Sequence, residues 1–306
     1  VAVENLAETI ANLSRRANER EIVVFNLCDG SEIDGYPGLS VIRALDAAGL
    51  PYSGANAEFY EKTTTKITSK RMFDASGVAT PPMVEVSELP EDIDRAFAQL
   101  GSPIILKPDV SAGSYGIGND SVCNDRQSAI SKVKTLRQDR YIAGSAIFAE
   151  PFVKGREFTV FAVEDDSEPL GLRILVPCER AFNQALPELE RFCSYERHWN
   201  LPVQGAQLPV GEEYCVHLPV EGELRDRLAA LVRRAVRAVS GSSYARCDVR
   251  LDQATDALLV LEVNSQCELS SDPKSEIGSI LQFSRLTMSG LLDQILSHAL
   301  ARADPA

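Results

Sequence analysis

Short apolar runs that end in turns alternate with stretches of helical spacing in the first part of the chain. The run EIVVFNL (21–27) stops at a loop rich in Gly and Asp, which predicts a buried strand that feeds a turn. Residues 39–50, LSVIRALDAAGL, have helical spacing and a stop signal at Gly49. The start, VAVENLAETIANLSRR, predicts an amphipathic helix, and 56–77 predicts one more helix. This order is typical of an α/β arrangement.

The same alternation continues toward the C-terminus. After a proline-rich stretch at 80–86, the pattern predicts helices over 90–101, 127–138 and 225–241, and then a helical tail. Strands are predicted at 103–109 and, as two runs around a Lys-Gly turn, within 146–165. The segment RCDVRLDQATDALLVLEVN (246–264) predicts a hairpin. We find no internal repeat and no low-complexity segment in the sequence.

The predicted hairpin brings polar side chains to one face. Side chains alternate along a strand, so Glu262 and Asn264 share a face. If DQATDA is the turn, residue 251 pairs near 259 and Asp248 pairs near Glu262, which adds a second carboxylate. Two carboxylates and a carboxamide oxygen form a cluster that suits Mg²⁺. The alternative is that Glu262 and Asn264 only end a strand and face water.

A glycine-rich loop follows the predicted strand at 103–109. In KPDVSAGSYGIG, Lys107 ends the apolar run, and three glycines allow the backbone to approach a ligand closely. This arrangement is typical of a mobile loop that covers phosphate groups. The loop lacks the Gly-Lys-Ser/Thr ending of a P-loop and the Gly-x-Gly-x-x-Gly spacing of a dinucleotide site. The alternative is a surface loop without a ligand.

Composition and charge narrow the class of protein. The chain has 306 residues, long enough for two or three lobes, and 44% of them are hydrophobic. No apolar stretch reaches the ~18 to 20 residues of a membrane span. The net charge of −13 argues against non-specific binding to nucleic acid or anionic membranes. Seven scattered cysteines and only three histidines give no zinc pattern and indicate a reducing cytoplasm. The chain begins with Val, so we expect a leading segment that is removed or unseen.

Taken in order, the motifs resemble the ATP-grasp superfamily, most closely the D-alanine–D-alanine ligase branch. GLPYSG (49–54) with TKITSK (65–70) resembles the segment that carries the first nucleotide-binding lysine, and PIILKPDVSAGSYGIG (103–118) resembles the second lysine with the lid. FAEPFVKGREFTV (148–160) resembles the adenine and ribose segment, and ARCDVRLD with LLVLEVN resembles the metal segment. The resemblance covers about residues 21 to 300.

The resemblance implies a fold and an activity. The expected fold combines α/β and α+β parts: a Rossmann-like lobe at 1–69, incomplete at its start, a central ATP-grasp lobe with the lid at 70–155, and a C-terminal ATP-grasp lobe with the Mg²⁺ site at 156–306. The last two lobes sandwich ATP. The implied activity is ATP-dependent ligation of a carboxylate to an amine through an acyl phosphate, with release of ADP and phosphate. The small-molecule substrates are expected to be amino acids.

The resemblance also implies residue roles. Lys70 and Lys107 bind phosphates, Glu150 with the backbone of Phe152 and Val153 binds adenine, and Glu157 binds the ribose; Gly113 and Ser114 belong to the lid, and Asp248, Glu262 and Asn264 hold two Mg²⁺ ions, or Mn²⁺. Arg246 stabilises the oxyanion that forms when the amine attacks. Structural alternatives remain open. Lys70 could be a solvated helix residue, Arg246 could pair with Asp248, and the two glutamates could be exposed strand residues.

Departures from the family pattern bear on the substrate. Gly113 stands where the ligases carry the first serine of a lid pair, and Tyr195-Glu196-Arg197-His198-Trp199 has His198 in place of a phosphate-side lysine and Trp199 in place of a substrate-side tyrosine. Cys267 and Glu268 stand in place of a Pro-Gly turn. We therefore expect substrates other than two D-alanines.

The expected substrate residues are Trp199, Glu268, Ser271 and Glu32, and His198 and Ser114 join the catalytic group. Trp199 and His198 could instead pack against the lid, and Cys267 is either a reactive thiol or a small turn residue. Two alternatives to the main reading are a true D-alanine–D-alanine ligase and a nucleotide-binding regulatory protein without turnover. Analogy alone suggests a homodimer.

Overall fold

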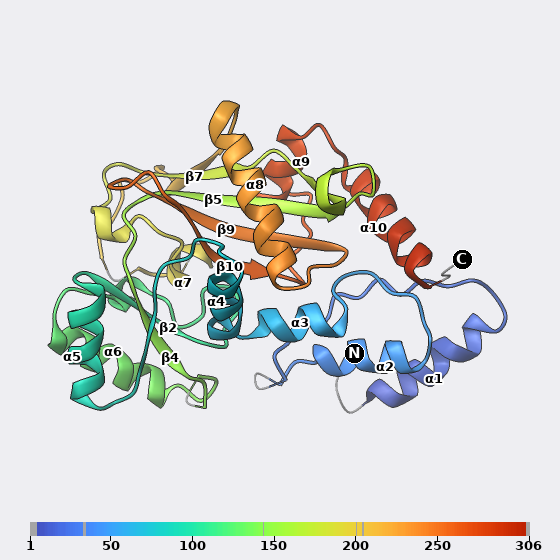
Figure 1. Ribbon diagram of the computed structural model, residues 1–306, viewed down its shortest axis with the longest axis horizontal. Coiled ribbons are helices and arrows are strands. Elements are labelled where there is room, and N and C mark those ends of the chain that lie inside the picture. Colours follow the sequence, from blue (N-terminus) through green and yellow to red (C-terminus); the bar gives the residue numbers. More distant parts are fainter. Residues whose placement is uncertain (1–4, 33–34, 143, 200, 204, 304–306) are drawn as a thin grey trace.

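The described residues form two sheets with helices packed on them (Figure 1). The computed structural model describes residues 5–32, 35–142, 144–199, 201–203 and 205–303. The smaller sheet belongs to the middle of the chain, and the larger sheet to its C-terminal half. Four helices precede them: α1 (Leu6–Ala17), α2 (Leu39–Ala47), α3 (Ala57–Thr64) and α4 (Lys66–Ala75).

The strand predicted at 21–27 is present only as a single parallel bridge. Val24 pairs with Tyr52. The Val24 amide donates to Pro51 O (2.8 Å), and the Ser53 amide donates to Val24 O (2.9 Å). The bridge lies beside an apolar cluster in which α1 packs against α2. The N-terminal helix predicted from the first residues is therefore confirmed as α1.

The single helix predicted over 56–77 is wrong, because the chain breaks it at Thr65. Thr65 is extended (φ −109°, ψ 124°) and separates α3 from α4. Three successive β-branched threonines weaken the helix there. Asp109 then satisfies the start of α4, since the Ile67 amide donates to Asp109 Oδ1 (2.7 Å) and the Lys66 amide donates to Asp109 O (3.1 Å). The break places the first turn of α4 beside the loop that follows Lys107.

The smaller sheet is antiparallel and has the strand order β1-β4-β2-β3. Its strands are β1 (Val84–Val86), β2 (Ile104–Pro108), β3 (Val122–Cys123) and β4 (Ile147–Pro151), and its helices are α5 (Pro90–Leu100) and α6 (Arg126–Gln138). Figure 1 shows α5 and α6 together at one side of this sheet. A separate apolar core joins the helices to the sheet. The glycine-rich loop connects β2 to β3 and faces the larger sheet.

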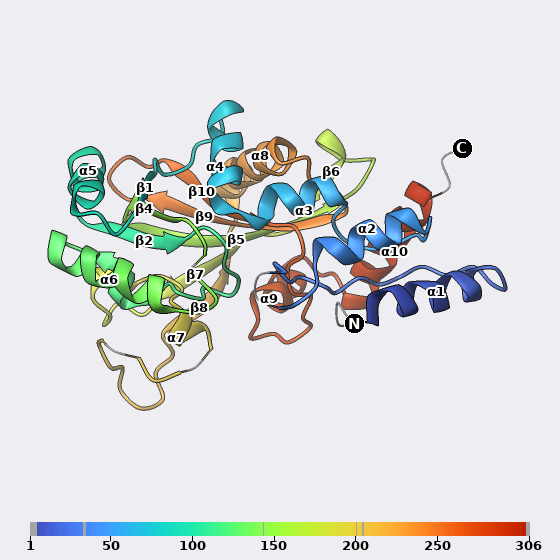
Figure 2. The ribbon, with the colours of Figure 1, turned by 90° about the horizontal axis from the view of Figure 1, so that it is seen from below.

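The larger sheet has the order β10-β9-β5-β7-β8, with β6 paired to β5. Its strands are β5 (Gly155–Glu164), β6 (Leu172–Ile174), β7 (Cys178–Phe182), β8 (Cys215–Pro219), β9 (Tyr244–Asp252) and β10 (Leu258–Asn264). Helix α8 (Gly222–Ala238) covers one face, while α9 (Glu276–Phe283) and α10 (Met288–Ala303) cover part of the other (Figures 1 and 2). The short α7 (Tyr195–His198) lies near the lid.

Alternation along β5 explains both cores and the site. Val160 and Ala162 pack toward α8, while Phe161 and Val163 pack toward α9 and α10. Farther along the second face, Glu157 and Thr159 take the place of the apolar side chains. Beyond the edge of α9 and α10, this face of the sheet is therefore polar, and it stays buried because the smaller sheet and the lid lie over it.

The hairpin at 246–264 forms with one irregularity. Leu251 pairs with Leu258, next to the predicted position 259, and a bulge between Val260 and Glu262 then shifts the register by one. Glu262 consequently pairs with Asp248, as predicted, and Asn264 pairs with Arg246. The bulge thus keeps Glu262 and Asn264 on the face that carries Asp248.

The predicted lobe boundary between residues 69 and 70 falls inside α4. This helix contacts α8 and strand β10 of the large sheet, so the lobe boundaries stay a prediction.

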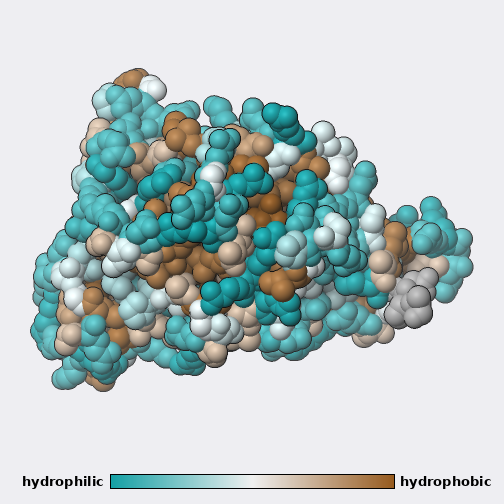
Figure 3. Space-filling model, turned by 45° about the horizontal axis from the view of Figure 1, so that its top comes forward, coloured by the Kyte–Doolittle hydropathy of each residue, from teal (hydrophilic) through white to brown (hydrophobic). Residues whose placement is uncertain are grey.

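Among the described residues, every helix is too short or too polar to cross a bilayer. Hydrophilic residues dominate the face in Figure 3, and apolar residues show mainly in its hollows.

Candidate active site

A cavity of about 340 Å³ lies between the two sheets, beneath the glycine-rich loop. The smaller sheet contributes Lys107 and Glu150, and the large sheet contributes its polar face. Predicted site residues that line the cavity are Lys107, Gly113, Ser114, Glu150, Phe152, Val153, Glu157, His198, Trp199, Arg246, Asp248, Glu262, Asn264 and Glu268. The structure therefore brings together residues that lie far apart in the sequence.

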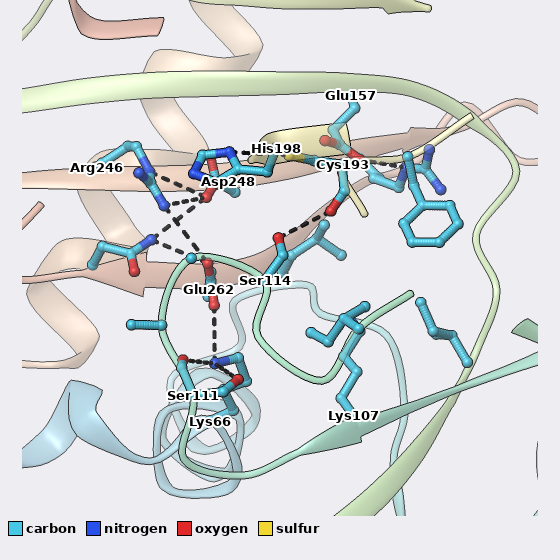
Figure 4. A pocket seen from close by; sticks show the side chains of 18 of the residues that line it. Lys66, Lys107, Ser111, Ser114, Glu157, Cys193, His198, Arg246, Asp248 and Glu262 are labelled. Atoms are coloured by element: carbon cyan, nitrogen blue, oxygen red, sulfur yellow. Dashed lines mark hydrogen bonds and ion pairs between the residues drawn. The ribbon is translucent and has the colours of Figure 1, made fainter. Parts of the chain in front are cut away.

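Asp248, Glu262 and Asn264 form an acid–acid–amide trio on one side of this cavity, and Figure 4 shows the two carboxylates beside Arg246. Asn264 Nδ2 lies 3.2 Å from Glu262 Oε1 and 3.5 Å from Asp248 Oδ2. Thr159, opposite Asp248 on β5, donates its hydroxyl to Asp248 Oδ1 (2.8 Å). Arg246 Nη2 lies 3.1 Å from Asp248 Oδ2 and 3.8 Å from Glu262 Oε1, so the predicted Arg246–Asp248 pair forms.

The two carboxyl groups of the trio differ in their electrostatic environment. Burial raises the pKa of Asp248, and the neighbouring Glu262 adds to this, although Arg246 and Arg180 oppose it. Burial also acts to raise the pKa of Glu262, but Lys66 and Arg246 outweigh it and lower the pKa to about 2. A bound metal cation, added to these positively charged side chains, would favour the ionised form of both Asp248 and Glu262.

The donor set of the trio fits a hard divalent cation. It supplies two carboxylates and one carboxamide, and oxygen ligands of this kind suit Mg²⁺. Asn264 would have to present its oxygen in place of Nδ2. Among the described residues there is no cluster of three or more His, Cys, Asp or Glu that could hold a metal, so the trio with its asparagine is the candidate.

Lys66, which the sequence analysis did not select, lines the cavity. Its Nζ lies 3.4 Å from Glu262 Oε2 and donates to Ser111 O in the lid (2.7 Å). Lys70, one helical turn later, is only 1% exposed and is absent from the residues that line the cavity. The structure therefore does not place Lys70 among the cavity-lining residues, and the alternative of a solvated lysine is wrong. Lys66 takes the position that faces the cavity because it starts α4 beside the lid.

Lys70 instead belongs to a buried cluster around Glu150. The two side chains form an ion pair, and Lys70 also donates to Thr80 Oγ1 (2.7 Å). Lys107 Nζ lies 2.5 Å from the other carboxylate oxygen of Glu150. Burial lowers the pKa of Lys70, although Glu150 opposes this, and the two lysines together lower the pKa of Glu150 against the effect of burial. Glu150 is not an exposed strand residue.

The carboxylate of Glu157 is held by two buried arginines. Arg180 Nη1 donates to Glu157 Oε1 (2.8 Å), and Arg250 Nε lies 3.3 Å from Glu157 Oε2. Arg250 also donates to Val153 O (2.7 Å) and lies over the Phe152 ring, 5.1 Å from its centroid. Glu157, Phe152 and Val153 therefore form one connected end of the cavity.

The lid is held by contacts on three sides. Lys66 binds Ser111, the Ser114 hydroxyl donates to Cys193 O (3.0 Å), and the Trp199 indole donates to Gly113 O (3.1 Å). Gly113 has φ +55°, and a Cβ placed there would lie 3.0 Å from Trp199 Cζ2. Trp199 therefore packs against the lid, as the alternative reading of this residue stated, and its indole occupies space beside Gly113.

His198 lies beside Trp199 at the same side of the cavity. Its Nδ1 is 3.7 Å from Cys193 Sγ, and its ring meets that of Trp199 edge to face. Burial lowers the pKa of His198 below its ordinary value, so the imidazole is neutral near pH 7. The charge that a lysine would bring is therefore missing at this position.

Two predicted substrate residues are placed elsewhere. Glu32 accepts hydrogen bonds from the amides of Gly38 (3.0 Å) and Ser40 (2.8 Å) at the start of α2, so its carboxylate is used by a helix terminus. Ser271 is exposed and is not one of the described residues that line the cavities. Burial raises the pKa of Cys267 to about 12, which favours the protonated thiol and the interpretation of Cys267 as a small turn residue.

Several cavity residues escaped the sequence analysis. They are Lys66, Arg180, Cys193, Arg250 and Glu276. Arg250 lies on the same face of β9 as Arg246 and Asp248, because side chains alternate along a strand. The alternation that predicts the face of Asp248 therefore also predicts the face of Arg250. Arg180 had no such signal, because its position depends on how β7 pairs with β5.

A second cavity of about 620 Å³ adjoins the first. The two share Asp29, Ser111, Ala112, Trp199, Asn264 and Gln266. Aromatic residues contribute much of its described lining, namely Tyr36, Tyr60, Tyr115, Tyr141, Tyr195 and Trp199. The first cavity therefore has an adjoining compartment on the far side of Trp199.

Comparison with known proteins gives a consistent picture. A family model described as "D-ala D-ala ligase C-terminus" matches residues 72–296. A D-alanine–D-alanine ligase of Chromohalobacter salexigens is 30% identical over 257 residues, which cover 84% of this chain and 70% of that protein.

Solved structures extend the likeness. A D-alanine–D-alanine ligase of Bacillus anthracis complexed with ATP aligns with a TM-score of 0.68 at 19% identity, covering 96% of this chain and 84% of that one. A D-Ala:D-Ser ligase of Enterococcus faecalis aligns with a TM-score of 0.69 at 16% identity, covering 92% and 74%. These structures share the fold.

Proposed function

Because the chain belongs to the D-alanine–D-alanine ligase family, whose members are ATP-dependent carbon–nitrogen ligases of the ATP-grasp fold, we propose that it joins two D-alanine molecules. The observation that carries the proposal is the joint presence, around one cavity, of two lysines and an acid–acid–amide trio. A nucleotide-binding protein without turnover has no need to keep this full set together.

The proposed reaction has two steps. A substrate carboxylate oxygen attacks the γ-phosphorus of ATP, the bond to the β-phosphate oxygen breaks, and ADP leaves. The amine of the second substrate then attacks the acyl phosphate, loses a proton, and inorganic phosphate departs from the new amide. Positioning and charge stabilisation supply most of the catalysis in phosphoryl transfer.

Residues of this chain have assigned roles in the proposal. Lys66 and Lys107 neutralise phosphate oxygens, and Lys66 replaces Lys70 in that role because it lines the cavity. Glu157 accepts from the ribose hydroxyls, and the backbone of Phe152 and Val153 meets the adenine. Arg246 stabilises the oxyanion of the second step. The lid residues Gly113 and Ser114 exclude water from the acyl phosphate.

The proposed metal site is the trio of Asp248, Glu262 and Asn264. Bound Mg²⁺ would neutralise charge on the phosphates, which is the chemistry that a divalent ion supplies in such reactions. Lys66 and Arg246 now compensate the two carboxylates. We infer that both cations turn toward phosphate or substrate oxygens when the site is loaded.

A second candidate, favoured by one observation, is a ligase that uses a different amine. The Trp199 indole lies against Gly113 and lines both cavities. The bulky Trp199 side chain, at the junction of the two cavities, limits the space that is open to the amine substrate. The reaction steps stay the same, and only the second substrate differs.

One assay separates the candidates. The chain is incubated with ATP, Mg²⁺ and D-alanine, alone and paired with other amino acids as the amine, and ADP, phosphate and the dipeptide are measured by chromatography. We expect D-alanyl-D-alanine and equal amounts of ADP and phosphate, with L-alanine as the control substrate. Turnover only with other amines supports the second candidate, and no turnover with any pair contradicts ligase activity. Formation of AMP and pyrophosphate would contradict the acyl-phosphate route.

Two further expectations, one about the cellular compartment and one about the oligomeric state, remain part of the proposal. All seven cysteines are free, which fits a reducing compartment such as the cytoplasm. A homodimer is expected by analogy, and light scattering of the purified chain tests it.

A further inference from the structure

Arg180 lies between the two ends of the candidate site and has no part in the proposed chemistry. It is on β7, directly opposite Glu157 of β5. Its side chain is 5% exposed and lines the cavity. A buried arginine needs several acceptors, because its planar guanidinium carries five donors in a fixed arrangement.

Three carboxylates surround this guanidinium. Nη1 donates to Glu157 Oε1 (2.8 Å), and Nη2 lies 3.8 Å from Asp248 Oδ1. Nε and Nη2 both lie 3.0 Å from Glu276 Oε1, at the first turn of α9. Arg180 therefore touches the residue proposed for the ribose and lies within ion-pair distance of one proposed for the metal, and α9 holds it from behind.

We propose that Arg180 is a positioning residue that fixes Glu157 and Asp248 relative to each other, so that one side chain aligns the ribose end of the site with its metal end. The inference rests on the proposed nucleotide and metal roles of these two carboxylates. It concerns binding, and it does not depend on which amino acids are joined.

The contacts of the two carboxylates indicate how the alignment works. Glu157 has a second partner in Arg250, and Asp248 has a second partner in Arg246. In the strand register, Arg250 lies level with Glu157 and Arg180, whereas Arg246 lies farther along β9, beyond Asp248. Without Arg180, Glu157 keeps Arg250, and Asp248 keeps Arg246 and the Thr159 hydroxyl, so Glu157 and Asp248 lose the arginine that they share.

Arg250 provides a contrast within the same site. It also pairs with Glu157, but its other contacts go to Val153 O, Arg191 O and the Phe152 ring. Its influence is therefore confined to the nucleotide end. If Arg180 only stabilises the fold, its substitution lowers the free energy of unfolding and nothing else. If Arg180 links the two ends of the site, its substitution weakens binding at the ribose end and at the metal end together.

The experiment measures equilibrium binding, without turnover, on the full chain. The ribose readout is the ratio of affinities for ATP and 2′,3′-dideoxy-ATP, measured by calorimetry with EDTA present. The metal readout is the affinity for Mn²⁺ in the presence of ADP, measured by electron paramagnetic resonance. We compare Arg180→Lys and Arg180→Met with Arg250→Lys and Arg156→Met.

Arg156→Met is the matched control. Arg156 also bridges β5 and β7, through Glu179, but half of its side chain is exposed. We expect the Arg180 variants to lose roughly tenfold in the ribose ratio and roughly tenfold in Mn²⁺ affinity, as for the loss of a charged hydrogen bond. Arg250→Lys should change the ribose ratio alone, and Arg156→Met should change neither.

Defined results overturn the inference. If Arg180→Lys and Arg180→Met keep both readouts, or change only one of them, Arg180 does not link the two ends. If the Arg180 variants fail to fold, Glu276→Gln keeps the arginine but weakens its hold on α9, and both readouts should still fall, by a smaller factor. A wild-type chain that binds neither ATP nor Mn²⁺ also overturns it. A wild-type chain that binds both but makes no amide contradicts only the ligase proposal.

Discussion

Glu150 and Glu262 are both acidic residues held by two cations, and they differ in their access to the cavity. The Glu150 side chain is 2% exposed and lies between Lys70 and Lys107. The Glu262 side chain is 28% exposed and lies between Lys66 and Arg246. The buried Glu150 carboxylate holds its two lysines in place, although one of them, Lys107, lines the cavity. The partly exposed Glu262 carboxylate can exchange its partners for a ligand. We therefore expect substitution of Glu150 to act mainly on stability and substitution of Glu262 mainly on activity.

The largest effect is expected for Glu262→Gln. The amide keeps the shape but removes one of the two negative charges of the proposed metal site, and several kcal/mol of charge stabilisation depend on such sites. ADP formation should fall by roughly a thousandfold, since each factor of ten corresponds to about 1.36 kcal/mol. Thermal unfolding should be nearly unchanged, because the variant also removes repulsion between Asp248 and Glu262. Retained activity would break the comparison.

The next effect concerns Glu150→Gln. The change leaves two ammonium groups close together without a counter-ion, one of them fully buried. Breaking a buried pair in this way costs about 3–5 kcal/mol of unfolding free energy. Urea denaturation measures the loss. A loss below about 1 kcal/mol, the range of exposed pairs, would show that the cluster is not closed in solution.

A pair of variants one helical turn apart sharpens the contrast. Lys66→Met removes a cation that lines the cavity, and we expect the affinity for ATP to fall by roughly tenfold with little change in stability. Lys70→Met removes a buried partner of Glu150, so stability should fall while the affinity per folded molecule changes less. Calorimetric titration with ATP measures the first effect, and urea denaturation the second. Equal effects of the two substitutions on affinity would contradict the assignment of Lys66.

A further difference is expected in acid stability at Glu276, and it shows only at low pH. Burial acts to raise the pKa of Glu276, but Arg180 and Arg246 lower it to about 2, from an ordinary value of 4.5. The ionised group therefore stabilises the fold fully above about pH 4.5, and this contribution is lost as the pH falls through about 2.

Glu276→Gln lacks the titrating group, so the stability gap between wild type and variant should close between pH 4.5 and pH 2. Denaturation at a series of pH values measures the gap. A gap that stays constant over this range would show that Glu276 is not held by Arg180 and Arg246.

The sequence could predict the parts of the site that depend on local alternation. The face shared by Asp248, Glu262 and Asn264 follows from strand geometry, and a bulge that the sequence does not announce restores the pairing of Asp248 with Glu262. The burial of Glu150 and Glu157 cannot be predicted in this way. Alternation tells which face of a strand a side chain lies on, but not whether another element covers that face. The covering here comes from a second sheet and a lid.

The parts that could not be predicted depend on contacts between distant segments. Lys66 and Lys70 lie on one helix face, so helical spacing cannot tell which of them meets the cavity. Asp109 and Thr80 determine which lysine faces the cavity. Asp109 accepts a hydrogen bond in the first turn of α4, which begins at Lys66, and Thr80 accepts a hydrogen bond from the buried Lys70. Glu32 is an expected substrate residue, but its carboxylate accepts hydrogen bonds from two amides at the start of α2, a contact that the sequence pattern does not indicate.

Trp199 is the sole tryptophan of the chain, and it sits where the lid meets both cavities. Its emission is therefore an intrinsic optical signal from one place in the molecule, free of overlap from other indoles. Rapid mixing with nucleotide can follow the breaking and remaking of its bond to Gly113 in real time, without a label.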